Sequence, residues 1–295
     1  MRPTRETVEG RAYLDLQNQA RRDMRPTDEL LARLAASPAA KSLVLKGGVL
    51  LAAFGARRPT RDVDLHAEHV SSDAESVLAL IRSIAAIDVQ DGLVFTPDGA
   101  RAEVIRGEEQ YSGVRVSLAC SLARADVTFH VDVNVGDPIT PEPQRVAIPR
   151  LLGGEVHVLG YPLAMVHAEK IVTAIGRGVA NTRWRDFGDL YVLSRRHDVV
   201  GAELATALAA VATHREIELR PLTLVLAGYA GLAQTRYQFW RRKNRREELP
   251  EHFDDVLTQV IAFADPAVNG GSRPAHLACL QRRLGLMRAA LRPVR

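Results

Sequence analysis

Two carboxylates one residue apart, Asp62 and Asp64, have the spacing that most clearly suggests chemistry in this chain. In an extended strand alternate side chains point to the same face, so both would lie on one face, separated by two rises of about 3.3 Å. Phosphoryl transfer by two divalent cations needs carboxylates that hold the ions about 3.5–4 Å apart. The pair therefore predicts a metal-dependent site for phosphoryl transfer.

A later alternating stretch, residues 127–135, supplies a third carboxylate. His130, Asp132 and Asn134 share one face of the expected strand, and apolar residues share the other. Asp132 is therefore the best candidate for a third metal ligand. This assignment depends on the alternation of the strand.

A glycine pair, Gly47-Gly48, follows the apolar run 42–45, at a point where a strand is expected to turn into a helix. Glycines there let the backbone approach phosphates closely, and Lys46 and Arg61 add positive charge. Each feature has an ordinary alternative, since glycine pairs are often simple turns and an Asp-x-Asp is often a solvated face. Their order within twenty residues is what makes the arrangement specific.

The elements that would position these residues follow from hydrophobic periodicity. Helices are expected at 5–23, 27–37, 49–54 and 73–87, and strands at 42–45, 62–67, 93–95, 102–105, 114–119, 127–135 and 156–159. A proline-rich connector is expected over 138–149, followed by helices at 162–178, 183–195, 200–213, 221–240, 250–264 and 274–291. The expected fold is α/β (α+β), a mixed sheet with flanking helices and then a helical C-terminal domain.

Composition sets the outer limits. A length of 295 residues suggests two domains, and an apolar share of 46% is ordinary for a globular protein. Two separated cysteines make a disulfide framework or a structural zinc site unexpected, and the charged N-terminus resembles no signal peptide. Because the longest apolar stretch is too short to span a bilayer, we expect a cytoplasmic protein with no membrane contact.

The central block resembles the nucleotidyltransferase superfamily of the DNA-polymerase-β type, and within it the AbiEii toxin family with its mycobacterial MenT-type members. The matching residues are Leu45-Lys46-Gly47-Gly48, Leu51, Arg58, Thr60, Asp62, Asp64 and Leu65. Thr60 stands where many members have Ser, and both residues carry the hydroxyl that could contact a phosphate. The resemblance implies that Gly47, Gly48 and Thr60 cradle phosphates.

A second block strengthens the resemblance: Ala168-Glu169-Lys170, then Arg185-Asp186, Asp189 and Leu190. The family treats the Lys and the first Asp of this block as active-site residues, which implies catalytic roles for Lys170 and Asp186 beside Asp62 and Asp64. Lys170 would offset charge on the phosphates, and Asp186 could orient either Lys170 or the acceptor hydroxyl. The spacing alone also fits a salt bridge between two neighbouring helices.

The resemblance implies an Mg²⁺- or Mn²⁺-dependent enzyme that transfers a nucleoside monophosphate from an NTP to the 3′ end of tRNA, blocks translation and has a cognate antitoxin. Residues 1–155 would form the nucleotidyltransferase domain, and residues 156–295 a helical domain that completes the active-site cleft. Two alternatives stay open: an adenylyltransferase that modifies a small molecule or a protein, and a non-catalytic regulator that binds nucleotides or RNA.

A basic segment with interleaved aromatics, residues 236–246, is the expected RNA-docking surface. Its sequence, RYQFWRRKNRR, offers cations for a nucleic-acid backbone and rings on which a base could stack. The alternative is a helix whose rings belong to the core and whose arginines are solvated.

Overall fold

The computed structural model describes residues 6–7, 26–57, 60, 62–106, 112–122, 125–150 and 153–270. They form two compact units, one within Met1–Asp137 and Pro143–Tyr161, the other within Pro138–Glu142 and Pro162–Arg295. The expected helix at 274–291, almost all of the one at 5–23, and Arg58 and Arg61 lie outside the described residues.

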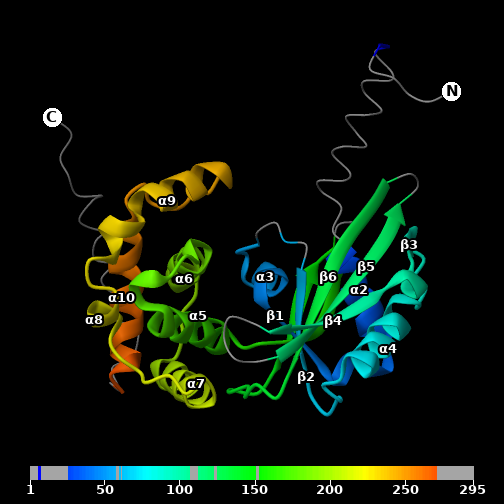
Figure 1. The fold of residues 1–295 in the computed structure, drawn as a ribbon, viewed down its shortest axis with the longest axis horizontal. Coiled ribbons are helices and arrows are strands. Elements are labelled where there is room, and N and C mark those ends of the chain that lie inside the picture. Colours follow the sequence, from blue (N-terminus) through cyan, green and yellow to red (C-terminus); the bar gives the residue numbers. More distant parts are fainter. Residues whose placement is uncertain are drawn as a thin grey trace. The chain divides into compact units, whose positions relative to one another are not determined.

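The first unit is built on one mixed sheet, in which the described residues form eight strands (Figure 1). These are β1 (Leu43–Lys46), β2 (Asp62–Ala67), β3 (Leu93–Phe95), β4 (Arg101–Arg106), β5 (Ser112–Leu122), β6 (Ala125–Val135), β7 (Gln144–Pro149) and β8 (Glu155–Gly160). Their order is β3-β5-β6-β2-β1-β8-β7, and β4 also pairs with β5. The pairs β2–β6 and β1–β8 are parallel, and the other pairs are antiparallel.

Alternation gives the sheet one apolar and one polar face. Val63, Leu65, Val131 and Val133 are almost fully buried, while the residues between them are polar. The helices α2 (Pro26–Ala36) and α4 (Ala74–Ala85) lie together on one side of the sheet, and the single turn α3 (Gly47–Leu50) lies on the other (Figure 1). Short 3₁₀ helices occur at Pro38–Lys41, Leu51–Phe54 and Pro97–Gly99.

Two local predictions for this unit were wrong. The expected connector over 138–149 contains strand β7, which pairs with β8 at the edge of the sheet. Proline is tolerated there because an edge strand leaves one row of backbone groups unpaired, and Pro149 ends the strand. The expected helix at 49–54 is instead α3 followed by a 3₁₀ turn, which Gly55 ends at a φ of 62°.

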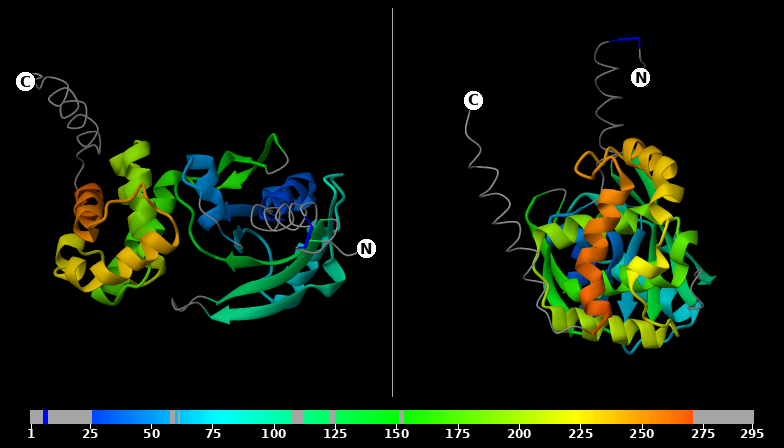
Figure 2. Two further views of the ribbon diagram at one scale, coloured as in Figure 1. Left: turned by 90° about the horizontal axis from the view of Figure 1, so that it is seen from above. Right: turned by 90° about the vertical axis from the view of Figure 1, so that its left-hand side faces the viewer.

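The second unit is helical. It contains α5 (Leu163–Arg177), α6 (Trp184–Arg196), α7 (Gly201–His214), α8 (Leu222–Val225), α9 (Tyr229–Lys243) and α10 (Phe253–Val268), with a 3₁₀ turn at Gly178–Ala180. Figures 1 and 2 show α10 packed beside α6 and α9. The expected single helix at 221–240 was wrong, because Gly228, at a φ of 75°, separates α8 from α9. Within the part of the chain that the structure describes, no helix has both the length and the apolar character needed to cross a bilayer.

A cluster of aromatic rings forms the core of the second unit. The Phe253 ring lies 5.6 Å from Phe187, 5.5 Å from Tyr229 and 4.7 Å from Tyr237, measured between centroids. The two tyrosine hydroxyls donate to the backbone carbonyls of Asn181 and Pro250. The expected fold class, a mixed α/β core followed by a helical region, is thus confirmed.

Candidate active site

A row of five charged residues crosses the polar face of the sheet. Backbone register pairs Lys46 of β1 with Asp64 of β2, Asp64 with Asp132 of β6, Asp132 with Arg115 of β5, and Arg115 with Glu103 of β4. Paired residues on neighbouring strands point to the same face, so these side chains lie next to one another in that order. The sequence placed Lys46, Asp64 and Asp132 in one site, and the register puts them in one line.

A second row runs beside the first. Asp62 pairs with His130, and His130 with Ser117, whose hydroxyl lies 3.2 Å from the His130 Nδ1 atom. Asp62 and Asp64 are both half-buried, whereas the side chains on the opposite face are sealed in the core. We call the surface formed by Asp62, Asp64 and Asp132 the acidic face.

Gly47 sets the position of Asp64. A Cβ atom at Gly47 would lie 1.9 Å from the Asp64 Oδ2 atom, and Gly47 has a φ of 66°, which disfavours any residue with a side chain. The backbone N–H of Gly48 donates a hydrogen bond to the Asp64 carboxylate. The glycine pair thus supports a carboxylate, and its expected role of cradling phosphates stays a prediction. Because α3 is a single turn, it offers little helix dipole for that role.

The acidic face raises the pKa of Asp64 above its usual value. Burial is the largest cause, and the neighbouring Asp132 charge is the next. Lys46 and the Gly48 N–H act in the opposite direction, and Asp62 adds to the increase. A carboxylate held in this state gains free energy when a cation comes near it.

Asp132 is the most tightly paired carboxylate of the acidic face. Arg115 donates from Nε to Oδ1 at 2.8 Å and from Nη2 to Oδ2 at 2.7 Å, a bidentate pair. The pair raises the pKa of Arg115, chiefly through the hydrogen bond to Asp132. Asp132 is 8% exposed, so little solvent reaches its carboxylate, and this guanidinium is its dominant neighbour.

The cation and the hydroxyl expected beside the glycine pair have protein partners. The Lys46 Nζ atom lies 3.0 Å from the Asp137 Oδ2 atom and 5.5 Å from the centroid of the Tyr161 ring. The Thr60 hydroxyl accepts a hydrogen bond of 3.2 Å from the Asp62 backbone N–H. Lys46 therefore lies beside the acidic face, Thr60 stabilises the turn that leads into Asp62, and contacts of either residue with phosphate stay predictions.

Two carboxylates of the acidic face have the chemistry that a divalent cation needs. Asp62 and Asp64 offer carboxylate oxygens, which Mg²⁺ and Mn²⁺ prefer, and Gly47 leaves the space into which Asp64 projects. Among the described residues, no group of three His, Cys, Asp or Glu side chains is arranged to hold a metal ion. Two carboxylates thus fit the ion, and Asp132 is held by Arg115.

The second unit contains the other predicted cluster. The Lys170 Nζ atom donates to Asp186 Oδ1 at 2.8 Å and to Asp189 Oδ2 at 3.0 Å, which joins α5 to α6. Burial raises the pKa of Asp186, but the Lys170 charge and hydrogen bond outweigh it, and the net shift is downward. The spacing allowed a Lys170–Asp186 salt bridge as an alternative, and the structure contains that contact together with the one to Asp189. The catalytic roles of Lys170 and Asp186 stay predictions.

One turn before Lys170, His167 is completely buried, and its ring centroid lies 4.6 Å from that of Phe263. Burial, helped by the Lys170 charge, lowers the pKa of His167 to about 3. This histidine is therefore neutral at physiological pH and belongs to the core.

The basic segment divides between core and surface. Tyr237 is buried, Trp240 packs against it with centroids 6.1 Å apart, and Arg241 donates from Nε to the Leu249 carbonyl at 2.8 Å. Phe239 is 68% exposed, and the exposed cations one turn to either side of it are Arg236, Arg242 and Lys243. Each of the two interpretations of the segment, RNA-docking surface and core helix, therefore fits one ring: Tyr237 belongs to the core and Phe239 to the surface.

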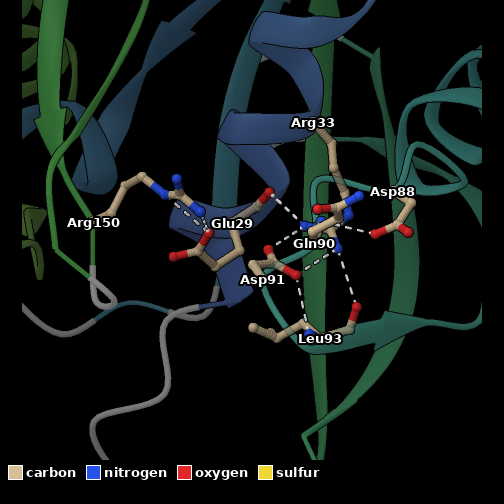
Figure 3. A network of polar contacts seen from close by, with 7 residues as sticks. All are labelled: Glu29, Arg33, Asp88, Gln90, Asp91, Leu93 and Arg150. Carbon is tan, nitrogen blue, oxygen red and sulfur yellow. Dashed lines mark hydrogen bonds and ion pairs between the residues drawn. The ribbon is translucent and has the colours of Figure 1, made fainter.

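A further charged cluster stabilises the first unit, and the sequence did not single it out (Figure 3). Arg33 donates to both oxygens of Asp91, at 2.6 and 2.9 Å, and to the carbonyls of Glu29 and Leu93. Arg150 pairs with the Glu29 carboxylate. We call the group formed by Glu29, Arg33, Asp91 and Arg150 the α2 network.

Sequence reasoning missed two partners of the predicted site residues, Arg115 and Asp137, and it named Asp189 without pairing it with Lys170. Arg115 alternates with valines in the expected strand 114–119, so its polar face was visible in the sequence. The register that places it opposite Asp132 is a long-range property that alternation does not reveal. Arg61 lies outside the described residues.

A family model described as nucleotidyl transferase AbiEii toxin, type IV TA system, matches residues 29–259, which is more than half of the chain. The crystal structure of a Helicobacter pylori protein described as a nucleotidyltransferase shares 13% identity and has a TM-score of 0.50, covering 85% of this chain and 96% of that one. The crystal structure of JHP933 from Helicobacter pylori shares 12% identity at a TM-score of 0.47, covering 89% of this chain and 97% of that chain. No curated protein matches.

Proposed function

The chain belongs to the AbiEii nucleotidyl transferase toxin family of type IV toxin–antitoxin systems, and from this premise we propose that it transfers a nucleoside monophosphate from an NTP to the 3′ end of tRNA. The acceptor hydroxyl forms a new bond to the α-phosphorus, and the bond from that phosphorus to the β-phosphate oxygen breaks. Pyrophosphate leaves, and the hydroxyl proton passes to solvent. A tRNA extended in this way would no longer accept an amino acid, which would arrest growth.

The observation that carries the proposal is the acidic face, with Asp64 held against Gly47 in the row that Asp132 and Arg115 continue. Asp62 and Asp64 would hold the divalent cation. When bound, that cation supplies positive charge at the α-phosphate and lowers the pKa of the attacking hydroxyl. The raised pKa of Asp64, which is caused first by burial and then by the neighbouring Asp132 charge, supports this assignment, because strongly perturbed carboxylates cluster at functional sites.

The protein's own cations would balance the charge of the triphosphate. Lys46 lies beside Asp64 on the first unit, and Lys170, oriented by Asp186 and Asp189, lies on the second. A fixed ammonium group stabilises charge that develops on the leaving pyrophosphate. We propose that Lys170 and Asp186 act in the same reaction as Asp62 and Asp64, so that residues 1–155 and residues 156–295 both contribute catalytic residues.

A nucleic-acid acceptor is supported by helix α9. No acidic residue occurs from Tyr229 to Lys243, and its exposed cations, Arg236, Arg242 and Lys243, flank the exposed ring of Phe239. Cations beside an exposed aromatic ring suit an RNA backbone with an unpaired base stacked on the ring. A small-molecule acceptor would need no such surface. The family also implies a cognate antitoxin as a partner.

The deciding experiment incubates the protein with each α-labelled NTP and total tRNA in the presence of Mg²⁺, and follows the label into RNA. Asp62→Ala should abolish incorporation. Asp126→Ala, which removes an exposed carboxylate from the same strand as Asp132, should leave it unchanged. Parallel reactions with aminoglycosides and with protein extract serve as acceptor controls. Incorporation that survives Asp62→Ala, or label found only on a small molecule or a protein, would overturn the proposal.

A further inference from the structure

The pair formed by Arg115 and Asp132 bears on how many metal ions the acidic face holds. Both carboxylate oxygens of Asp132 accept charge-assisted hydrogen bonds, at 2.8 and 2.7 Å, from two nitrogens of one guanidinium. The two residues face each other in the β5–β6 register, so the backbone pairing brings them together. Arginine stays protonated at any physiological pH, so this cation is permanent.

A guanidinium in this position competes with a metal ion for Asp132. The fork neutralises the negative charge that a carboxylate must offer as a ligand, and it uses a lone pair of each oxygen. A divalent ion that used Asp132 would have to displace Arg115 or share its carboxylate. Among the described residues, no guanidinium forms such a fork with Asp62 or Asp64, and the Nζ atom of Lys46, which pairs with Asp64 in the register, lies 3.0 Å from the Asp137 carboxylate.

The charges of the three carboxylates agree with this competition. Both hydrogen bonds of the Arg115 fork go to Asp132, so the guanidinium offsets that carboxylate. Glu103, on the other side of Arg115 in the register, is exposed to solvent. Asp62 and Asp64 keep two negative charges between them, as many as one divalent cation balances.

We infer that Arg115 acts as the permanent second cation of the acidic face, so that the protein binds one divalent ion through Asp62 and Asp64, and Asp132 serves to hold Arg115. This inference rests on the proposed function and specifies the composition of its site. The side chain of Arg115 is 32% exposed. A donor nitrogen, Nη1, is not used in the pair with Asp132 and is available to a phosphate oxygen of the NTP.

The test counts bound Mn²⁺ by electron paramagnetic resonance, with the full chain and a non-hydrolysable α,β-methylene NTP analogue. The wild type should bind one ion. Asp62→Asn should weaken binding by about tenfold or more, as expected for loss of a ligand. The paired variant Arg115→Gln with Asp132→Asn keeps the charge of the face constant, and should still bind one ion with an affinity within about twofold of wild type.

Two single variants sharpen the test. Arg115→Gln frees the Asp132 carboxylate, so the Mn²⁺ count should rise to two or the single ion should bind about tenfold more tightly. Arg115→Lys keeps the cation and should leave the count at one. Circular dichroism and thermal unfolding, measured on each variant, ensure that only folded protein is compared.

The results separate this inference from the proposed function. Two ions in the wild type, one of them lost in the paired variant, would overturn the role of Arg115 and restore Asp132 as a ligand. Unchanged Mn²⁺ binding in Asp62→Asn would instead overturn the metal assignment within the proposed function. Because the readout is a count of ions, a variant that only slowed catalysis would not be mistaken for support.

Discussion

Charged side chains gather in two places in the first unit, and the two differ in how completely their charges are balanced. In the α2 network, Arg33 and Asp91 form a bidentate pair with side chains 2% exposed, and Arg150 neutralises Glu29. On the acidic face, three carboxylates stand in adjacent rows with one guanidinium paired to them.

The pKa shifts reflect this contrast. Burial raises the pKa of Asp91, but the hydrogen bonds from Arg33 and from the Leu93 N–H outweigh burial, and the net shift is downward. Asp64 shifts upward, because burial and the Asp132 charge outweigh Lys46. The contrast holds for these two aspartates, because burial also raises the pKa of Glu29 within the α2 network, against the opposing effect of Arg150. A carboxylate whose pKa is lowered stabilises the fold through its charge, whereas one whose pKa is raised costs stability.

The largest expected effect is a loss of stability when an ion pair of the α2 network is removed. Asp91→Asn removes the partner of a buried guanidinium, and loss of one member of a buried ion pair typically costs about 3–5 kcal/mol in the free energy of unfolding. Chemical denaturation of wild type and variant measures this loss in the free energy of unfolding. Asp88→Asn, an exposed neighbour, should change stability by less than about 0.5 kcal/mol. Equal effects of the two substitutions would show that the network does not stabilise the unit.

The second prediction concerns catalysis on the acidic face. Gly47→Ala places a methyl group where the Asp64 carboxylate lies. Displacement of a catalytic group by about 1 Å can cost about 100-fold in rate, so NTP incorporation should fall by at least that factor. Gly99→Ala is the control, because nothing lies within 4 Å of its Cβ position. Normal activity in Gly47→Ala would contradict the role assigned to this glycine.

The third prediction is a gain in stability on the acidic face, where the first was a loss in the α2 network. Asp64→Asn removes an unfavourable charge, so the free energy of unfolding should rise by about 1 kcal/mol. Differential scanning calorimetry should then show a melting temperature about 2–4 °C higher. A melting temperature below that of the wild type would mean that the acidic face is balanced like the α2 network.

The smallest expected effect is the pH dependence of the stability differences between wild type and the variants Asp64→Asn and Asp91→Asn. A carboxyl whose folded pKa is raised costs stability above its unfolded pKa, and the cost disappears as it takes up a proton on acidification. The advantage of Asp64→Asn should therefore shrink as pH falls from 7 towards 4. Asp91 has a lowered pKa, so its charge stabilises above the unfolded pKa and this contribution is lost only as pH falls through the lower, folded value. Melting curves of both variants should be measured from pH 7 to pH 4. The melting temperature gained by Asp64→Asn should decline over this range, and the melting temperature lost by Asp91→Asn should stay constant. The reverse pattern would contradict the direction assigned to the two pKa shifts.

The sequence predicted the parts of the fold that depend on local pattern. The Asp-x-Asp strand and the helix 73–87 both have clear periodicity or caps, and both occur in the structure, as β2 and α4. Strand β7 was missed because prolines dominate its neighbourhood, and Gly228 was not recognised as a break because the apolar pattern runs across it. The α2 network was not predicted, since burial of Arg33 and Asp91 follows from packing between segments far apart in the sequence.

For the candidate site, the sequence identified the carboxylates but not their partners. Asp62 and Asp64 could be paired from a two-residue spacing, and Asp132 from alternation. Arg115 became visible only when the register of β5 against β6 was known, and the contact of Gly47 with Asp64 depends on the backbone geometry at the start of α3. Sequence spacing therefore gave the residue types of the site, and the sheet register gave the balance of charges.

The claim that the acidic face performs nucleotidyl transfer is tested most directly with Asp64→Asn. Incorporation of α-labelled NTP into tRNA should be measured for this variant and for wild type, alongside the melting temperature of each. The account predicts a protein that melts at a higher temperature and incorporates label at least about 1,000-fold more slowly, as expected when a group central to the chemistry is lost. A stable Asp64→Asn protein that transfers label at the wild-type rate would contradict it.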